Sequence, residues 1–454
     1  MDTNSKLNNW EDPHYVHPWH DFKKEANHFA LASKGEGIYI YDQNGSRHID
    51  GPGGMWCVNL GYGRTEIADA ISEQAKRLPY CSPWYYSNEP AANLAKKIAE
   101  RTPGDLNNVF FTTCGSTAID SALRFVQFYF NFLDQPQKKT VIARDKGYHG
   151  STYFAASISG KERDKRKLDT LSENVSFLSD VNPNLRDTNE TESQWCDKKV
   201  TELEEKILEL GAENVAAFVA EPILASGGVV IPPKGYHKRT KTICEKYEVL
   251  YISDEVVTGF GRLGHWFASE EVFDIIPDII TCAKGLTSGY IPMGATIISN
   301  KLMRNLQNTN YEEIIFSNGF TYSGHPVSAA AGLKVIEIME RENTLQHVQS
   351  ITPLFQERLK AIETKFSIVK EARGIGLLGC LEGNIGTATT EESKLKKDYD
   401  FGSLIDKAAE KRGLIIRPII NMCVFSPPLT ITKEEINILF DILEESLKEV
   451  ENTI

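Results

Sequence analysis

A carboxylate and an amine end two apolar segments in the middle of the sequence. Residues 249–253 are rich in β-branched and aromatic side chains and lead to Asp254, and a similar run at 278–283 leads to Lys284. Such runs predict buried strands. Ligands of open α/β sheets bind beyond the carboxyl ends of the strands. Asp254 and Lys284 are therefore expected to face one crevice, either as a salt bridge or as groups that hold opposite ends of a cofactor.

A Gly-Ser turn is the second candidate site. Gly115 and Ser116 follow a strand predicted at 108–112 and precede a helix expected from about 118 to 133. Free N–H groups and the positive end of the helix dipole at such a position bind phosphate. An ordinary N-cap serine accounts for the same residues, so the turn alone leaves both interpretations open.

Three further groups stand where predicted strands give way to loops. Tyr148 lies in a loop between two glycines, Glu221 ends a strand, and Val256 points the same way as Asp254 along an extended chain. Together with the Gly-Ser turn they would suit a flat, cationic heteroaromatic cofactor that carries a phosphate. Tyr148 and Val256 would flank the ring, Asp254 would pair with a ring N–H⁺, and Lys284 would form a Schiff base. Pyridoxal 5'-phosphate requires these parts.

The order of the predicted elements indicates the fold class. Strands alternate with helices from about residue 108 to 300, which is typical of a mostly parallel α/β sheet. Asn44-Gly45 predicts a β-hairpin over 38–50. We expect three parts: an N-terminal segment at 1–60 that contributes to a small domain, a large cofactor-binding domain at 61–325, and a small α+β domain at 326–454.

Composition limits the classes of partner. The 454-residue chain has a net charge of −12 and no long basic run, which argues against nucleic acid and anionic membranes as partners. No apolar run reaches about 18 residues, the length needed for a transmembrane helix. The eight cysteines form no CxxC pair, and the N-terminus has no apolar signal core. These features predict a reduced, cytoplasmic protein.

Two patterns are interpreted as unrelated to cofactor binding. His14, His17 and His20 repeat at a spacing of three, but two prolines among them disfavour the helix that would align them, and no metal site is predicted. The glycines at 374–379 match GxGxxG. The residues after them indicate a strand, whereas a dinucleotide site requires a helix there, so the pattern does not support a dehydrogenase.

Several motifs carry a resemblance to a known family. They are Gly115-Ser116, Tyr148-His149-Gly150, Glu221-Pro222, Ser253-Asp254-Glu255-Val256, Gly259-Phe260-Gly261-Arg262, Lys284-Gly285 and Thr321-Tyr322-Ser323-Gly324-His325-Pro326. In combination they resemble the class III (ω-type) pyridoxal-phosphate aminotransferases of fold type I, over about residues 15–450. Residues 51–63 and Arg417-Pro418 are most similar to the branch that uses pyruvate as acceptor, which includes β-alanine, taurine, polyamine and (S)-amine transaminases.

The resemblance implies a cofactor site. Lys284 carries the Schiff base and moves the proton, and Asp254 keeps the ring nitrogen protonated. Thr321 reaches across a dimer interface to the phosphate of the neighbouring subunit. The implied cofactor-binding residues are Gly115, Ser116, Tyr148, Glu221, Asp254, Val256, Lys284 and Thr321.

The resemblance also implies a substrate site and an assembly. Trp56, Trp84 and Tyr85 form an aromatic pocket, and Arg417 is a mobile arginine that pairs with a substrate carboxylate. The substrates are an amine donor and a keto acid, and the assembly is a homodimer with shared active sites, or a tetramer. An aminomutase, racemase or decarboxylase on the same scaffold shares the motifs around Lys284 and stays an alternative.

The chain departs from the family after the Gly-Ser turn. The family commonly has an acid and a polar group at the positions of Thr117 and Ile119. The turn itself is retained, whereas contacts that those side chains make in relatives are placed in doubt.

Overall fold

Seven strands form the largest sheet of the computed structural model, which describes residues 14–19, 21–23, 31–386 and 390–454. Their order is β4-β10-β9-β8-β7-β5-β6, and only β10 runs antiparallel to its neighbours. The predicted mostly parallel sheet is therefore confirmed. The strands are β4 (Leu106–Thr112), β5 (Thr140–Arg144), β6 (Val175–Leu178), β7 (Val215–Ala220), β8 (Leu250–Asp254), β9 (Ile279–Cys282) and β10 (Gly294–Ser299).

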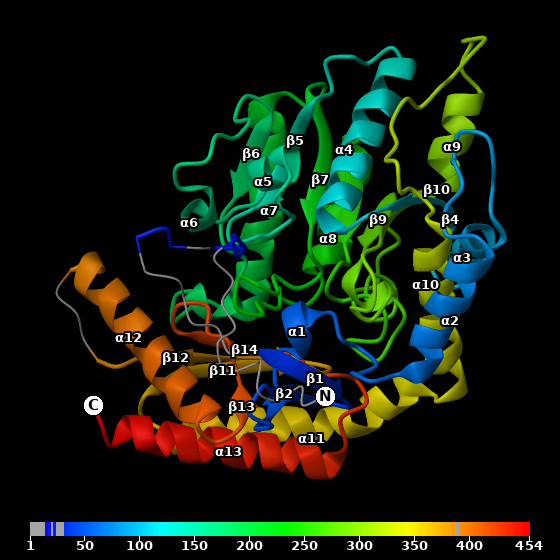
Figure 1. Cartoon of the computed structure of the whole chain (residues 1–454). Helices are drawn as coiled ribbons and strands as arrows, with labels where there is room; N and C mark the ends of the chain where they lie inside the picture. Colours follow the sequence, from blue (N-terminus) through cyan, green and yellow to red (C-terminus); the bar gives the residue numbers. More distant parts are fainter. Residues whose placement is uncertain (1–13, 20, 24–30, 387–389) are drawn as a thin grey trace.

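Helices bury both faces of this sheet, which explains why its strands are continuously apolar. On β7, Val219 packs in the core beneath α4 (Gly115–Phe132), while Phe218 packs in the core beneath α7 (Glu192–Leu210) and α8 (Tyr236–Lys246). Figure 1 shows α4 lying along the sheet. The carboxyl ends of β7, β8 and β9 are left free to build a site.

Other helices surround the sheet. The helices α2, α3 and α10 pack together beside it. The elements are α1 (Gly53–Trp56), α2 (Thr65–Arg77), α3 (Glu89–Ala99), α5 (Tyr153–Ser157), α6 (Glu162–Lys165), η3 (Pro183–Leu185), η4 (Lys284–Leu286), α9 (Asn300–Gln307) and α10 (Pro326–Arg341).

A second sheet joins the two ends of the chain. It has the order β1-β2-β3-β13, and β13 pairs with β3 in parallel. The predicted hairpin is confirmed, because β2 and β3 pair in antiparallel orientation. Asp42 Oδ1 stabilises the turn between them by accepting the backbone N–H groups of Asn44 and Ser46 at 2.8 Å each. The strands are β1 (Ala32–Glu36), β2 (Tyr39–Asp42), β3 (Arg47–Asp50) and β13 (Leu414–Ile415).

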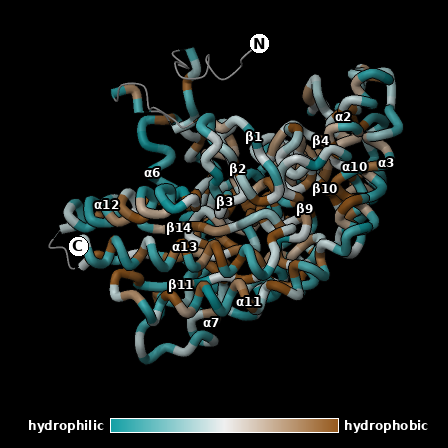
Figure 2. Tube along the Cα trace, turned by 60° about the horizontal axis from the view of Figure 1, so that its bottom comes forward, coloured by the Kyte–Doolittle hydropathy of each residue, from teal (hydrophilic) through white to brown (hydrophobic). Residues whose placement is uncertain are grey.

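A third sheet and three helices complete the smaller α+β part. In Figure 2 the helices α11 and α13 carry brown, hydrophobic stretches between teal ones, as expected for helices with one buried face. A small α+β domain built from both ends of the chain is thus confirmed, while its boundaries at 60 and 325 stay a prediction. The elements are β11 (Val369–Ile375), β12 (Leu378–Gly383), β14 (Met422–Phe425), α11 (Thr344–Lys365), α12 (Glu391–Glu410) and α13 (Lys433–Glu451).

Two local findings bear on the sequence predictions. The GxGxxG glycines belong to the antiparallel β11–β12 hairpin, and Gly376 takes a φ of 61° at its turn, so the strand expected after them is observed. The helix α12 begins at Glu391, in a charged segment that gives no apolar signal for a helix start. Thr390 caps it through Ser393, and the pairs Lys394–Asp398 and Lys396–Asp400 support a turn whose high charge hides any apolar period.

No helix in the described ranges is both long enough and apolar enough to cross a membrane.

Candidate active site

A cavity of about 360 Å³ lies beyond the carboxyl ends of the central strands. It is lined by residues from the start of α4, the loop after β5, and the ends of β7, β8 and β9. The structure therefore brings together predicted site residues as far apart in the sequence as Trp56 and Lys284. Among the predicted site residues, the cavity wall contains Trp56, Gly115, Ser116, Tyr148, Glu221, Asp254, Val256 and Lys284.

Asp254, the last residue of β8, is buried and held by three hydrogen-bonding groups. Its Oδ2 lies 2.7 Å from His149 Nδ1, and its Oδ1 accepts from the Val256 N–H at 3.2 Å and from Thr281 Oγ1 at 3.3 Å. Sequence reasoning assigned His149 no role, although it lies in one of the quoted motifs. The available signal was a histidine next to Tyr148 in a loop that follows a strand.

Lys284 enters the same cavity from the end of β9. Its backbone is left-handed, with a φ of 39°, and the next residue has no room for a side chain: a Cβ on Gly285 would lie 2.3 Å from Asn59 Nδ2. Burial lowers the pKa of the Lys284 amine, and the charge of Asp254 opposes this only in part. Within the described residues, no carboxylate lies within 4.0 Å of the amine, so the alternative of an Asp254–Lys284 salt bridge is not formed.

The Gly-Ser turn forms the first turn of α4, whose leading N–H groups have no intrahelical partner. Thr117 Oγ1 accepts the N–H groups of Thr113 at 3.2 Å and Cys114 at 3.0 Å. A hydroxyl thus caps this helix where relatives of the resembled family commonly have an acid. Ile119 is fully buried in the core under the helix, so both departures are accommodated.

Glu221 holds the loop that carries Tyr148. Its Oε1 accepts the Tyr148 N–H at 2.9 Å and its Oε2 accepts the Ala225 N–H at 3.1 Å. Burial raises the pKa of Glu221. Both carboxylate oxygens are engaged with backbone, so the structure places Glu221 as a group that positions the Tyr148 ring at the cavity wall.

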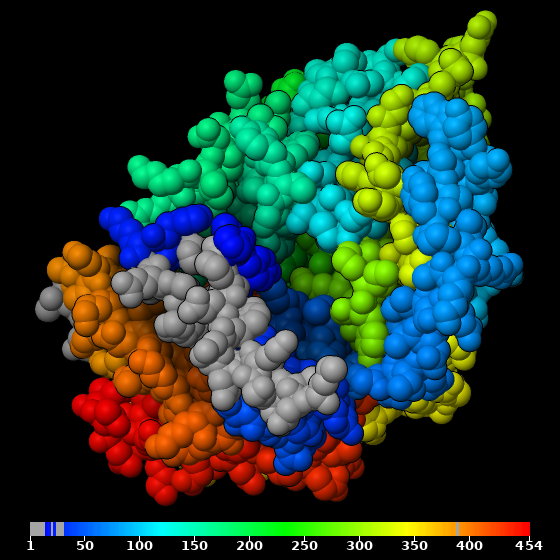
Figure 3. All heavy atoms as spheres, viewed as in Figure 1, coloured from blue at the N-terminus to red at the C-terminus, as the bar shows by residue number. Residues whose placement is uncertain are grey.

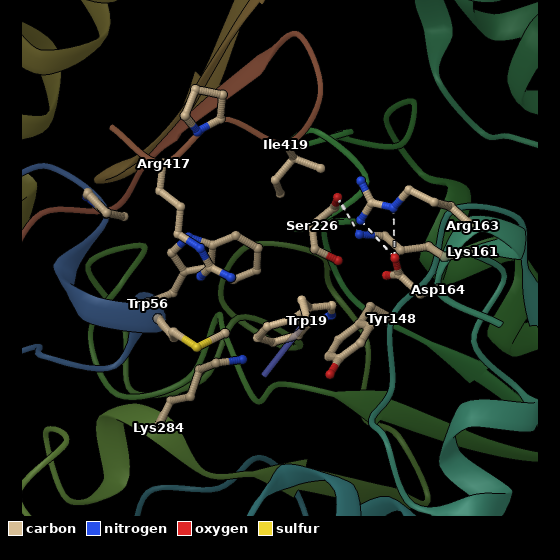
Figure 4. Close-up of a pocket in the computed structure, with 13 residues that line it drawn as sticks. Trp19, Trp56, Tyr148, Lys161, Arg163, Asp164, Ser226, Lys284, Arg417 and Ile419 are labelled. Carbon is tan, nitrogen blue, oxygen red and sulfur yellow. Dashed lines mark hydrogen bonds and ion pairs between the residues drawn. The ribbon is translucent and has the colours of Figure 1, made fainter. Parts of the chain in front are cut away.

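A second cavity of about 160 Å³ adjoins the first and shares Trp56, Tyr148, Ser226 and Lys284 with it. Figure 4 shows Arg417 reaching down beside Trp56 on one side. Arg417 takes a φ of 40°, and its guanidinium lies 5.4 Å from the centre of the Trp19 ring. In Figure 3 the blue atoms of residues 14–19 and 21–23 lie between the green and orange parts.

Sequence reasoning missed several residues of this second cavity. Trp19, Lys161 and Ser226 line it, and all three lie outside the motifs. Each comes from a loop or the N-terminal segment, where no periodicity indicates which way a side chain points.

Three predicted residues lie outside both cavities of their own chain. Trp84 and Tyr85 are 85% and 79% exposed, and they line a shallow surface pocket with Gly324. Thr321 is exposed nearby, and its carbonyl accepts the Tyr80 hydroxyl at 3.0 Å.

The metal pattern is answered only in part. His14 and His17 are described, while His20 lies outside the described residues. In the part of the chain that the structure describes, no three His, Cys, Asp or Glu side chains come close enough to hold a metal ion.

A mostly parallel seven-stranded sheet with a small domain from both chain ends, and a lysine and a buried carboxylate at the strand ends, defines an α/β enzyme of fold type I, the fold of pyridoxal-phosphate enzymes. More narrowly, the chain belongs to the aminotransferase class-III family, because residues 22–447 match the sequence model of that family.

Individual relatives agree with the family. The chain is 38% identical over 451 residues to the putrescine–pyruvate aminotransferase of Pseudomonas aeruginosa, covering 98% of this chain and 97% of that protein. It is 37% identical to gamma-aminobutyrate transaminase 1 of Oryza sativa subsp. indica, covering 94% and 83%. The solved omega transaminase of Pseudomonas jessenii in complex with PMP superposes with a TM-score of 0.91 at 30% identity, covering 97% of each chain. The protein is an aminotransferase.

Proposed function

We propose that this aminotransferase moves an amino group from an amine or ω-amino acid to pyruvate, with pyridoxal 5'-phosphate held between Asp254 and Lys284. The observation that carries the proposal is the placement of this buried carboxylate and this partly buried amine on one cavity without an ion pair between them. The names of the Pseudomonas relatives support the acceptor and the cofactor.

The residues present fit the cofactor. The start of α4 packs tightly against Val256, since a Cβ on Gly115 would lie 3.0 Å from Val256 Cγ1. The valine side chain gives an apolar surface against which a flat ring can lie. The free N–H groups of Gly115 and Ser116 suit a phosphate. Tyr148 would cover the other face, and Asp254 would accept a ring N–H⁺. When bound, pyridoxal phosphate supplies an electron sink for a carbanion next to nitrogen.

The side chains of the protein then handle the proton. Burial lowers the pKa of the Lys284 amine, which increases the neutral fraction that takes a proton from the substrate carbon and returns it. His149, Thr281 and the Val256 N–H keep the Asp254 carboxylate in place. Arg417 binds the carboxylate of the keto acid, because a guanidinium matches a carboxylate bidentately.

The site is completed by a second copy of the chain. Trp84, Tyr85 and Thr321 lie outside the cavities of their own chain, next to the exposed rings of Tyr80 and Tyr322, whose centres are 6.2 Å apart. An exposed aromatic patch is typical of an interaction surface. In a homodimer this surface would deliver the two aromatic side chains and Thr321 to the neighbouring site.

A donor panel tests the proposed function. The holoenzyme is incubated with 1,4-diaminobutane, β-alanine, 4-aminobutanoate, taurine or 1-phenylethylamine, with pyruvate as acceptor, and alanine is measured. Full conversion of the cofactor spectrum by an amine alone separates a transaminase from an aminomutase, racemase or decarboxylase. A much better rate with 2-oxoglutarate would contradict the acceptor, and no spectral conversion by any donor would contradict the function.

A further inference from the structure

The 160 Å³ cavity that contains Arg417 has a second group of polar side chains, on the side opposite Arg417. Figure 4 shows Lys161, Arg163 and Asp164 on the side opposite Arg417, with Ser226 next to Lys161 and the rings of Trp19 and Tyr148 below. These residues come from the loop around α6 and from the turn after β7. The reaction proposed above assigns no role to these polar side chains.

Lys161 presents a half-buried amine there. Its Nζ donates to the Ser226 carbonyl at 2.7 Å and lies 5.7 Å from the centre of the Tyr148 ring. No carboxylate in the described ranges lies within 4.0 Å of it. Burial lowers the pKa of Lys161 to about 8, which Asp164 and Glu221 oppose and Arg163 and Arg417 reinforce. The ammonium therefore has hydrogen-bonding capacity to spare and lacks an anion.

Ser226 adds a second unused group. The residue is 6% exposed, and no group of the described residues forms a hydrogen bond with its Oγ. Buried polar atoms are nearly always paired, and leaving one unpaired is costly. Ser226 lines both cavities, so a ligand in them can supply the missing partner.

The surrounding charges favour an anionic ligand. Among the described residues, Asp164 is the one carboxylate that lines the 160 Å³ cavity, and it is already engaged by Arg163 at 2.8 Å. The remaining charged groups on the wall, Lys161, Lys284 and Arg417, are all basic. An ammonium at the far end of an amine donor would be repelled by these cations. A carboxylate at that end would instead pair with Lys161 and accept a hydrogen bond from Ser226 Oγ.

We propose that Lys161 Nζ and Ser226 Oγ form an anion subsite that binds the distal carboxylate of an ω-amino acid donor. Arg417, on the other side of the cavity, serves the carboxylate of the keto acid. This inference rests on the proposed function and narrows its donor class. The two half-reactions then depend on different cations.

Paired donors of one length test the subsite. The holoenzyme variants Lys161→Met, Lys161→Arg and Ser226→Ala are compared with the parent on 4-aminobutanoate, butan-1-amine and 1,4-diaminobutane. For Lys161→Met, the KM for 4-aminobutanoate should rise ~10–100-fold, the loss expected for one charge-assisted hydrogen bond. The KM for butan-1-amine should change by less than ~3-fold, and that for the diamine should fall. Lys161→Arg should recover part of the loss.

A binding measurement without turnover gives the second readout. Calorimetric titration of the holoenzyme with butanoate should show weaker binding for both Lys161→Met and Ser226→Ala. Retained cofactor absorbance and an unchanged KM for pyruvate establish that the variants are folded. If Lys161→Met does not fold, Ser226→Ala carries the same comparison.

Several outcomes would overturn the subsite. They are an equal loss with all three donors, an unchanged KM for 4-aminobutanoate, or a diamine that loses as much as the amino acid. If no donor converts the parent holoenzyme, the proposed function itself fails. If butan-1-amine converts it and the variants do not discriminate, only the subsite fails.

Discussion

His149 Nδ1 lies 2.7 Å from Asp254 Oδ2, and both side chains are buried. The backbone N–H of His149 in turn donates to Ser159 Oγ at 2.9 Å. His149 is thus held in place through both its backbone and its ring. It connects the loop after β5 to the end of β8, so the position of Asp254 depends on a residue 105 positions earlier.

We expect His149→Phe to leave Asp254 Oδ2 without this partner. The free energy of unfolding of the apoprotein should fall by about 1–3 kcal/mol, the cost of an unsatisfied buried acceptor. Urea denaturation measures it. His149→Gln, which keeps a donor, is the control and should lose less. Equal stability of the parent and the phenylalanine variant would show that the pair contributes nothing.

The cap on α4 gives a second prediction. Thr117 Oγ1 accepts two backbone N–H groups at the start of the helix that we expect to hold the phosphate. Thr117→Ala should cost ~1 kcal/mol, typical of a lost cap, and should speed cofactor loss during dialysis. Thr117→Ser keeps the hydroxyl and should match the parent. Faster loss from the serine variant as well would point to the threonine methyl group instead.

Lys284 is expected to be indispensable. Lys284→Ala should abolish transamination and the visible absorbance that the bound cofactor gives with the lysine amine. A matched control is Lys138→Met, because Lys138 is a buried lysine that donates to the carbonyls of Val215, Tyr247 and Glu248 away from the cavity. That variant should lose stability and keep the absorbance. An active Lys284→Ala enzyme with an unchanged spectrum would refute the assignment.

A buried histidine should make the fold acid-sensitive. His237 Nδ1 lies 2.7 Å from the Tyr251 hydroxyl and Nε2 lies 2.9 Å from the Pro222 carbonyl, so the ring is satisfied when neutral. Burial, with a contribution from the charge of Arg144, lowers its pKa to about 3. Below its unfolded pKa of 6.5 the unfolded chain binds a proton that the folded chain does not, so stability falls as the pH falls towards 3.

The size of that effect can be measured. Between pH 6.5 and pH 5 the His237 contribution should fall by about 2 kcal/mol. His237→Gln retains an acceptor and a donor but does not titrate, so its unfolding free energy should depend less on pH by that amount. The same pH dependence in both proteins would mean that other groups cause the acid sensitivity.

The strand-end groups were predictable because one rule connects sequence to space. Parallel strands end at the same edge of a sheet, so Asp254 and Lys284 could be placed on one cavity from two apolar runs. The prediction that both chain ends contribute to the small domain followed from the resemblance to the family. Their actual contact, the pairing of Leu414 with Ile49, lies between residues whose separation in the sequence carries no signal.

The second cavity was not predictable for a different reason. Lys161 and Ser226 belong to irregular segments, and their proximity arises from how two loops pack. The first half of α12, at 391–400, is equally hard to predict, because it depends on capping and ion pairs rather than on an apolar stripe. Trp84, Tyr85 and Thr321 lie outside the cavities of their own chain, and the homodimer proposed to bring them to a neighbouring site cannot be positioned from one sequence.

Arg417 supplies the last prediction, because its backbone and its guanidinium are both in unusual positions. A left-handed φ of 40° is strained for an arginine, and its guanidinium lies over Trp19, with no carboxylate of the described residues within 4.0 Å. Such a side chain can leave its position without breaking an ion pair. We expect Arg417→Met to raise the KM for pyruvate ~10–100-fold, while conversion of the cofactor by butan-1-amine is largely spared.

Single-turnover measurements of each half-reaction check this expectation. Arg417→Lys is the control, since it keeps the charge and loses the bidentate fork, and it should fall between the parent and the methionine variant. An equal loss in both half-reactions would contradict a role confined to the keto acid. Because Lys161→Met should affect the amino-acid donor instead, opposite responses of the two variants would establish that carboxylates of donor and acceptor are bound at different ends of one cavity.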